Sequence, residues 1–175
     1  ALIRDGDTVF LGSGTTVLTA DSSAAFNGTV DVTGGTLRVS GATANAGTGT
    51  IALGAVGQLD IAGDATVTNT ITAGTGAVIS ASVTYGGTLG AGTLDLAAGA
   101  RLDLSASGSG ALKVTRVITD ASDDGQLRIT AGTVSLQSAN TYGGNTTVSG
   151  GTLQISGSGT AGNGGTIALG ANNLD

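Results

Sequence analysis

The chain has 175 residues, of which 33 are glycine, and it contains no proline, cysteine, methionine, tryptophan or histidine. Only 10% of the residues are charged, and twelve aspartates against six lysines and arginines give a net charge of −6. So few scattered basic residues disfavour a nucleic-acid partner, because phosphate binding requires clustered Lys and Arg. The absence of cysteine removes disulfides, thiol catalysis and cysteine-rich metal sites.

Short apolar–polar–apolar triplets recur along the chain and predict β-strands. A period of two places the outer Leu, Val or Ile of each triplet in a core and the middle residue in water. Helices are disfavoured, because a glycine every few residues costs about 1 kcal/mol each in a helix. The triplets lie at residues 30–32, 37–39, 59–61, 94–96, 102–104, 112–114, 127–129, 134–136 and 153–155.

A long internal repeat decides between the two β architectures that remain. Residues 26–53 align with residues 142–169 without a gap, and both copies contain V-[TS]-G-G-T-L followed by a Gly-rich loop and T-I-A-L-G-A. A sandwich usually has longer strands and larger core side chains, whereas a β-solenoid stacks similar coils of small aliphatics. We therefore predict an all-β parallel solenoid of about eight coils, at roughly 20 residues per coil. Residues 1–175 are read as one segment of a longer protein.

The stretch SANTYGGNTTVSGGTLQISG, residues 138–157, resembles the passenger-associated β-strand repeat of bacterial autotransporters. The first copy departs from that pattern, since Phe26 stands where the repeat has tyrosine. The resemblance implies a right-handed parallel β-helix that type V secretion exports through a C-terminal outer-membrane barrel of the same precursor. It also implies display on, or release from, the surface of a Gram-negative bacterium. The residues that carry the motif are Tyr142, Gly150, Gly151, Thr152 and Leu153, and in the first copy Gly34, Gly35, Thr36 and Leu37.

The aspartates are the first candidates for chemistry, because the chain has no histidine and no glutamate. Asp95 and Asp103 sit at the centres of triplets. A pair of aspartate carboxylates could act as the acid and base of a glycosidase. The alternative, which we favour, is a solvated row on the outside of the coil. Lys113, Arg116 and Arg128 are expected to pair loosely with such rows, each pair contributing at most about 1 kcal/mol.

Three further patterns are considered as ligand sites. Asp120, Asp123 and Asp124 form the densest acidic stretch and are weak candidates for Ca²⁺, but the loop spacing of known calcium motifs is missing and a solvated turn is favoured. The Gly-rich residues 162–166 lack a lysine and a following helix, so they are not expected to form a phosphate-binding loop. An ice-binding face is also a minor alternative, from four threonines expected on one side of residues 65–72. They are Thr66, Thr68, Thr70 and Thr72.

The leading functional hypothesis is a structural and adhesive stalk that binds a second copy or host and bacterial surface molecules, as in cell–cell aggregation. Weak contacts repeated along a lateral surface add together without a deep pocket. No catalytic residue and no cofactor are expected. The alternatives are a polysaccharide-acting enzyme on the same scaffold, and a segment that chiefly promotes folding and secretion of the passenger.

Overall fold

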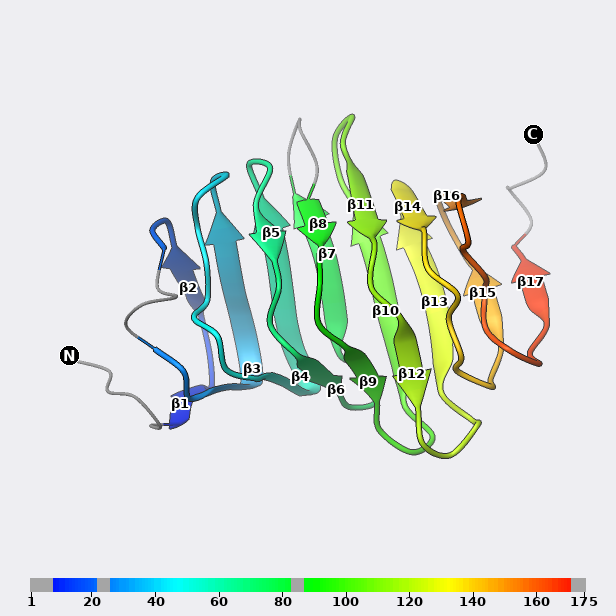
Figure 1. Cartoon of the computed structure of the whole chain (residues 1–175), viewed down its shortest axis with the longest axis horizontal. Helices are drawn as coiled ribbons and strands as arrows, with labels where there is room; N and C mark the ends of the chain where they lie inside the picture. The colour runs from blue at the N-terminus through cyan, green and yellow to red at the C-terminus, as the bar shows by residue number, and fades with distance from the viewer. Residues whose placement is uncertain (1–7, 22–25, 83–86, 171–175) are drawn as a thin grey trace.

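A computed structural model describes residues 8–21, 26–82 and 87–170 of the chain. These residues form seventeen strands and no helix, so none of them provides a helix that could span a membrane. Every strand pairing is parallel, and the strands stack as a β-solenoid of about seven turns (Figure 1). The predicted fold class is confirmed, with close to the expected number of coils.

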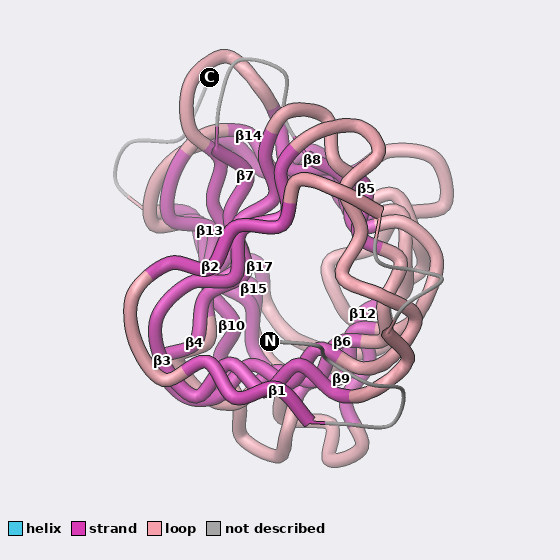
Figure 2. The backbone as a smooth tube through the Cα atoms, turned by 90° about the vertical axis from the view of Figure 1, so that its left-hand side faces the viewer, coloured by secondary structure: helices cyan, strands magenta, loops and turns pink. Residues whose placement is uncertain are grey.

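Each coil passes over up to three faces, which Figure 2 shows around the axis. The first face consists of β1 (Thr8–Leu11), the first parts of β3 (Thr29–Ser40) and β4 (Ile51–Ala62), β6 (Ile71–Ala73), β9 (Leu94–Leu96) and β12 (Ile118–Asp120). The second face consists of β2 (Thr15–Leu18), the later parts of β3 and β4, β7 (Val78–Ser82), β10 (Arg101–Ala106), β13 (Gln126–Ala131), β15 (Thr146–Val148) and β17 (Ile167–Leu169). The third face consists of β5 (Thr66–Val67), β8 (Gly87–Leu89), β11 (Ala111–Val114), β14 (Thr133–Leu136) and β16 (Thr152–Ile155).

The core is built from columns of aliphatic side chains that register places above one another. On the second face one column runs through six coils, and all its members are at most 1% exposed. Each such side chain contributes about 1.5–3 kcal/mol when it leaves water, and it does so only because neighbouring coils cover it. The column consists of Leu37, Leu59, Ile79, Leu104, Ile129 and Val148.

All nine predicted triplets lie inside strands, and the outer residues of the first eight are buried. The prediction for the middle residues was wrong at three positions: Asp60 is 2% exposed, Asp103 9% and Ser135 5%. These side chains do lie on the outer side of the wall, but neighbouring side chains cover them. Arginine side chains cover the two aspartates, as the ion pairs described below explain.

Candidate functional site

The paired glycines of the repeat form a corner where one coil touches the next. Gly35 and Gly151 have φ angles of 73° and 78°, a region that L-residues with a Cβ rarely adopt. A Cβ on Gly35 would lie 2.5 Å from the carbonyl oxygen of Gly14, and one on Gly151 would lie 2.2 Å from that of Gly132. The motif therefore has glycine here for two reasons, backbone conformation and close approach.

The residue after each glycine pair closes the coil with the same hydrogen bond. The backbone N–H of Thr36 donates to the carbonyl of Gly14 at 2.7 Å, and that of Thr152 donates to Gly132 at 2.7 Å. Leu37, which follows, is fully buried, whereas Leu153 in the second copy is half-buried near the end of the described residues. The two copies thus share the hydrogen bond at the corner.

The aromatic position of the repeat lies inside the solenoid. Tyr142 is fully buried and Phe26 is 6% exposed. The Tyr142 hydroxyl is 2.6 Å from Thr146 Oγ1, which in turn donates to the carbonyl of Ala161 at 3.2 Å. The first copy has an apolar pair at these positions, Phe26 with Val30, so the buried hydroxyl and its partner occur together. Burial raises the pKa of Tyr142 to about 12, although the hydrogen bond between Tyr142 and Thr146 opposes the shift.

Alkaline pH is expected to weaken the fold through Tyr142. The phenol has a pKa of about 12 when folded and 10.0 as a free group, so between these values the unfolded chain loses a proton that the folded chain keeps. Stability is therefore complete below pH 10 and falls toward pH 12, by up to about 3 kcal/mol. Urea unfolding of the wild type and of Tyr142→Phe at each pH measures this. The decline should be shallower in the variant, and an equal decline in both proteins would contradict the assignment.

The two copies of the repeat occupy different faces of the solenoid. In the first copy, residues 29–32 pair on the first face and residues 36–40 on the second. In the second copy, β15 pairs with β13 on the second face and β16 with β14 on the third. The copies are therefore rotated by one face relative to each other. What they keep in common is the corner and not a particular outer surface.

The acidic turn after β12 uses its carboxylates within the backbone. Asp120 accepts hydrogen bonds from the N–H groups of Asp123, Gly125 and Gly143. Asp124 accepts from Ser122 Oγ at 2.5 Å and, across coils, from the Gly99 N–H at 2.8 Å. These two bonds, the one from Ser122 first, lower the pKa of Asp124. Among the described residues no group of three or more His, Cys, Asp or Glu side chains is placed to hold a metal ion.

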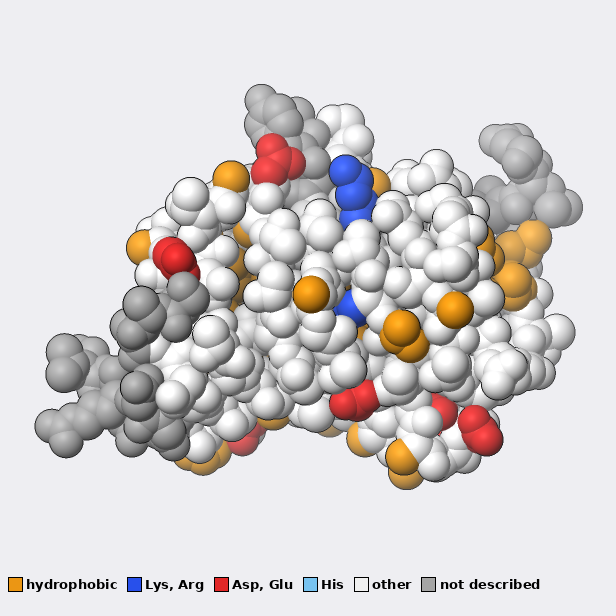
Figure 3. Space-filling view, in the orientation of Figure 1, with side chains coloured by type: hydrophobic (Ala, Val, Ile, Leu, Met, Phe, Trp, Pro, Cys, Tyr) orange, Lys and Arg blue, Asp and Glu red, His pale blue; other side chains and the backbone are white. Residues whose placement is uncertain are grey.

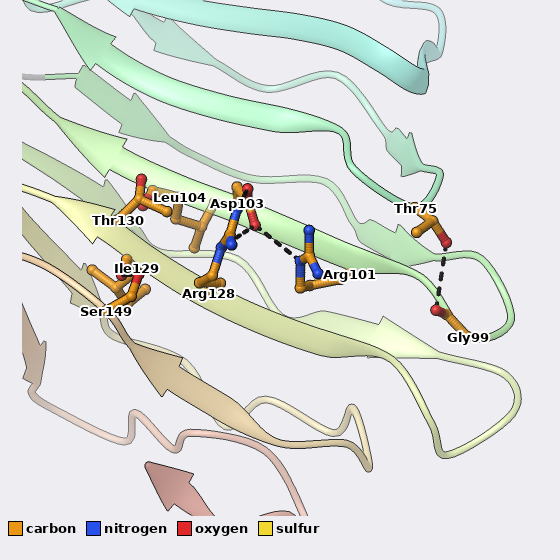
Figure 4. A network of polar contacts seen from close by, with 9 residues as sticks. All are labelled: Thr75, Gly99, Arg101, Asp103, Leu104, Arg128, Ile129, Thr130 and Ser149. Carbon is orange, nitrogen blue, oxygen red and sulfur yellow. Dashed lines mark hydrogen bonds and ion pairs between the residues drawn. The ribbon is translucent and has the colours of Figure 1, made fainter. Parts of the chain in front are cut away.

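Asp95 and Asp103 do not form a catalytic pair. Asp95 lies on β9 of the first face, where it accepts a hydrogen bond from Thr119 Oγ1, while Asp103 lies on β10 of the second face. Asp103 is nearly buried because Arg101 and Arg128 cover it, with Nε distances to its Oδ1 of 3.4 and 3.0 Å (Figure 4). The predicted pairing of Arg128 with an aspartate is confirmed, and its bond to Asp103 raises the pKa of Arg128.

Near the ends of strands, side-chain hydroxyl groups add hydrogen bonds between neighbouring coils. In Figure 4, Thr130 Oγ1 donates to the carbonyl of Leu104 at 3.3 Å, and Ser149 Oγ donates to that of Ile129 at 3.0 Å. These short side chains reach a backbone acceptor in the preceding coil. Many of the serines and threonines of the wall are therefore occupied by the fold itself.

Two other expectations from the sequence were wrong. Thr66 lies on β5 of the third face and Thr72 on β6 of the first, with buried Asn69 at the corner between them, so the four threonines share no single face. Arg116 is 2% exposed and pairs with no aspartate among the described residues. Its guanidinium instead donates to five backbone carbonyls of two earlier coils, and burial lowers its pKa to about 10.

Comparison with known families finds a repeat whose two matches begin and end near the glycine corners. The family model of the passenger-associated-transport-repeat matches residues 11–39 and 131–155. These two segments are similar to a repeat found in autotransporter passengers. Each match begins near a corner glycine, Gly14 or Gly132, and ends in the strand that follows the corner of the next coil. Together with the solenoid, the matches support an autotransporter passenger, as the resemblance indicated. No curated protein and no solved structure matches the chain.

The passenger repeat therefore corresponds to one coil that closes on itself. It starts with a strand after one glycine corner, passes around the solenoid and returns to bond the same corner from the next coil. This assignment is compatible with two copies that lie on different faces of the solenoid. It also agrees with a secreted or cell-surface protein of a Gram-negative bacterium.

Proposed function

We propose that the chain is a stiff segment of an autotransporter passenger whose lateral surface mediates adhesion or self-association. The passenger would be displayed on the bacterial surface or released from it, after export through a barrel of the same precursor. The repeat matches and the solenoid support the passenger assignment. The adhesive part of the proposal rests on the outer surface.

The observation that carries the proposal is the outer row of the third face. Register aligns five polar side chains there, spaced by the distance between neighbouring strands, about 4.8 Å. Only one of them is charged, and the side of the molecule seen in Figure 3 carries few charged side chains. The exposed members of this row offer several weak contacts, which add together when two surfaces align. The row consists of Thr66, Thr88, Lys113, Ser135 and Gln154.

The other two faces are less suited to meeting a second copy. The first face carries Asp31 and Asp95 in its outer row, so two such faces repel each other. On the second face Asp60 and Asp103 are engaged with arginines, including an Arg38–Asp60 contact of 2.6 Å. The third face is thus the one with a single charge in its outer row, of which Thr66, Lys113 and Gln154 are exposed.

Sedimentation velocity over a range of concentrations tests the proposal. The wild type is expected to associate as concentration rises, and Thr66→Asp with Gln154→Asp on the third face should abolish this by like-charge repulsion. Thr15→Asp with Thr147→Asp adds the same charge to the second face and should leave association unchanged. A wild type that stays monomeric throughout, or equal effects of the two charge pairs, contradicts the proposal.

A second candidate function is promotion of passenger folding and secretion. The rotation of the two repeat copies favours it, because the residues they share are a buried aromatic, a glycine corner and an inward leucine. Their outer residues differ: Asp31 and Arg38 in the first copy correspond to Thr147 and Gln154 in the second. A shared interior with unshared surfaces fits a unit that helps coils to close. Both functions are compatible in one segment.

A further inference from the structure

Arg116 lies between β11 and β12, at the corner where the third face meets the first, and all five of its N–H donors have acceptors. Its Nε donates to the carbonyl of Gly90 at 2.9 Å. One terminal nitrogen donates to Asn69 at 2.5 Å and to Thr93 at 3.2 Å. The other donates to Ala91 at 2.9 Å and to Val67. The arginine side chain has five N–H donors in a planar group, so all of its donors are used.

The acceptors belong to the backbone of residues 67–93, in the two coils that precede Arg116. Among the described residues, the carbonyls of Asn69, Gly90 and Ala91 accept from no backbone N–H, because they lie at a corner between strands. Asn69 also holds a buried Oδ1 that has no hydrogen bond in the described part of the chain. The corner therefore has a surplus of buried acceptors, which favours a cation.

A glycine brings the two acceptor coils close together next to the arginine. Asn69, Gly92 and Arg116 each lie two residues before three register partners, Ile71, Leu94 and Ile118. Gly92 has a φ of 107°, and a Cβ there would lie 2.7 Å from the carbonyl oxygen of Thr68 and 3.0 Å from that of Asn69. The two coils therefore approach closely at Gly92, and the guanidinium bonds carbonyls of both coils that precede its own.

We propose that this corner is a guanidinium-binding site, built from carbonyls of residues 67–93, that the chain fills with its own Arg116. The site selects a guanidinium over a metal ion or an ammonium because its acceptors surround a flat group with five donors. No carboxylate is among the acceptors, so shape and hydrogen bonds determine what binds. Removal of the arginine side chain leaves a site for free guanidinium.

The test uses the full chain with Arg116→Ala and guanidinium chloride as the probe. Millimolar guanidinium should raise the Tm of this variant by several degrees and then saturate, as a ligand that binds only the folded state does. The same concentrations should lower the Tm of the wild type slightly. If the variant is unfolded in buffer, guanidinium should restore the β circular dichroism signal of the wild type.

Matched controls separate binding from general salt effects. Arg128→Ala removes an outer arginine that has no such site, and its Tm should not rise with guanidinium. Sodium and calcium chloride at equal ionic strength, and urea as a neutral analogue, should not reproduce the effect on Arg116→Ala. Equal stabilisation by a metal salt, the same response of Arg128→Ala, or no rescue of folding or Tm by guanidinium would each overturn the proposal.

Discussion

We expect Arg116→Met to lower the free energy of unfolding by at least about 3 kcal/mol. Methionine keeps much of the aliphatic volume, so the loss reports the hydrogen bonds and not a cavity. Five carbonyls lose a donor at once, and the three that accept from no backbone N–H of the described residues, those of Asn69, Gly90 and Ala91, are left without a partner at about 1–3 kcal/mol each. Water can reach only part of the corner, since Arg116 is 2% exposed. Urea is the denaturant to use, because guanidinium is itself expected to bind.

Arg128→Met is the matched control for this experiment. Arg128 also makes short contacts, with Asp103, but its side chain is 36% exposed, and exposed ion pairs contribute at most about 1 kcal/mol. Asp103 also keeps Arg101 as a partner after the change. The two variants remove the same charge from the same kind of side chain. Similar losses in both would mean that the five carbonyls add nothing to stability.

Most strands could be predicted from the sequence because their alternation is local. The triplet at residues 94–96 shows its inner and outer positions without any knowledge of the rest of the chain. The triplets could not show which middle residues are covered, since Asp60 is buried by Arg38 from the preceding coil. That contact depends on coil lengths, which Gly-rich loops do not reveal.

Arg116 was missed although a signal for it exists. The alternation that places Leu112 and Val114 inward continues through Arg116 to Ile118, and all four are buried. The prediction relied on the usual exposure of arginine instead of on this period. The rotation of the repeat copies had no such signal, because an alignment records which residues recur and not the face on which they recur.

The glycine corner should be the most sensitive point of the passenger repeat. Gly151→Ala forces a side chain into φ 78° and places its Cβ 2.2 Å from the carbonyl oxygen of Gly132. The conformation alone costs about 1–2 kcal/mol, and relief of the clash separates the coils and breaks the 2.7 Å bond from Thr152 to Gly132. In a stacked array the damage stays near its coil. We expect loss of pairing of β16 with β14, while inner strands keep theirs.

Hydrogen exchange resolves this local effect, with Gly157→Ala as the control. Gly157 has a similar φ of 63°, but the nearest atom to its added Cβ is 3.6 Å away. Amides of residues 146–155 should exchange at least about 100-fold faster in Gly151→Ala, equivalent to about 3 kcal/mol, and about tenfold faster at most in the control. Slower refolding of Gly151→Ala alone would further support a role for the corner in folding. If both variants exchange alike, the corner requires glycine for its φ angle only, and the close approach of the coils contributes nothing to closure.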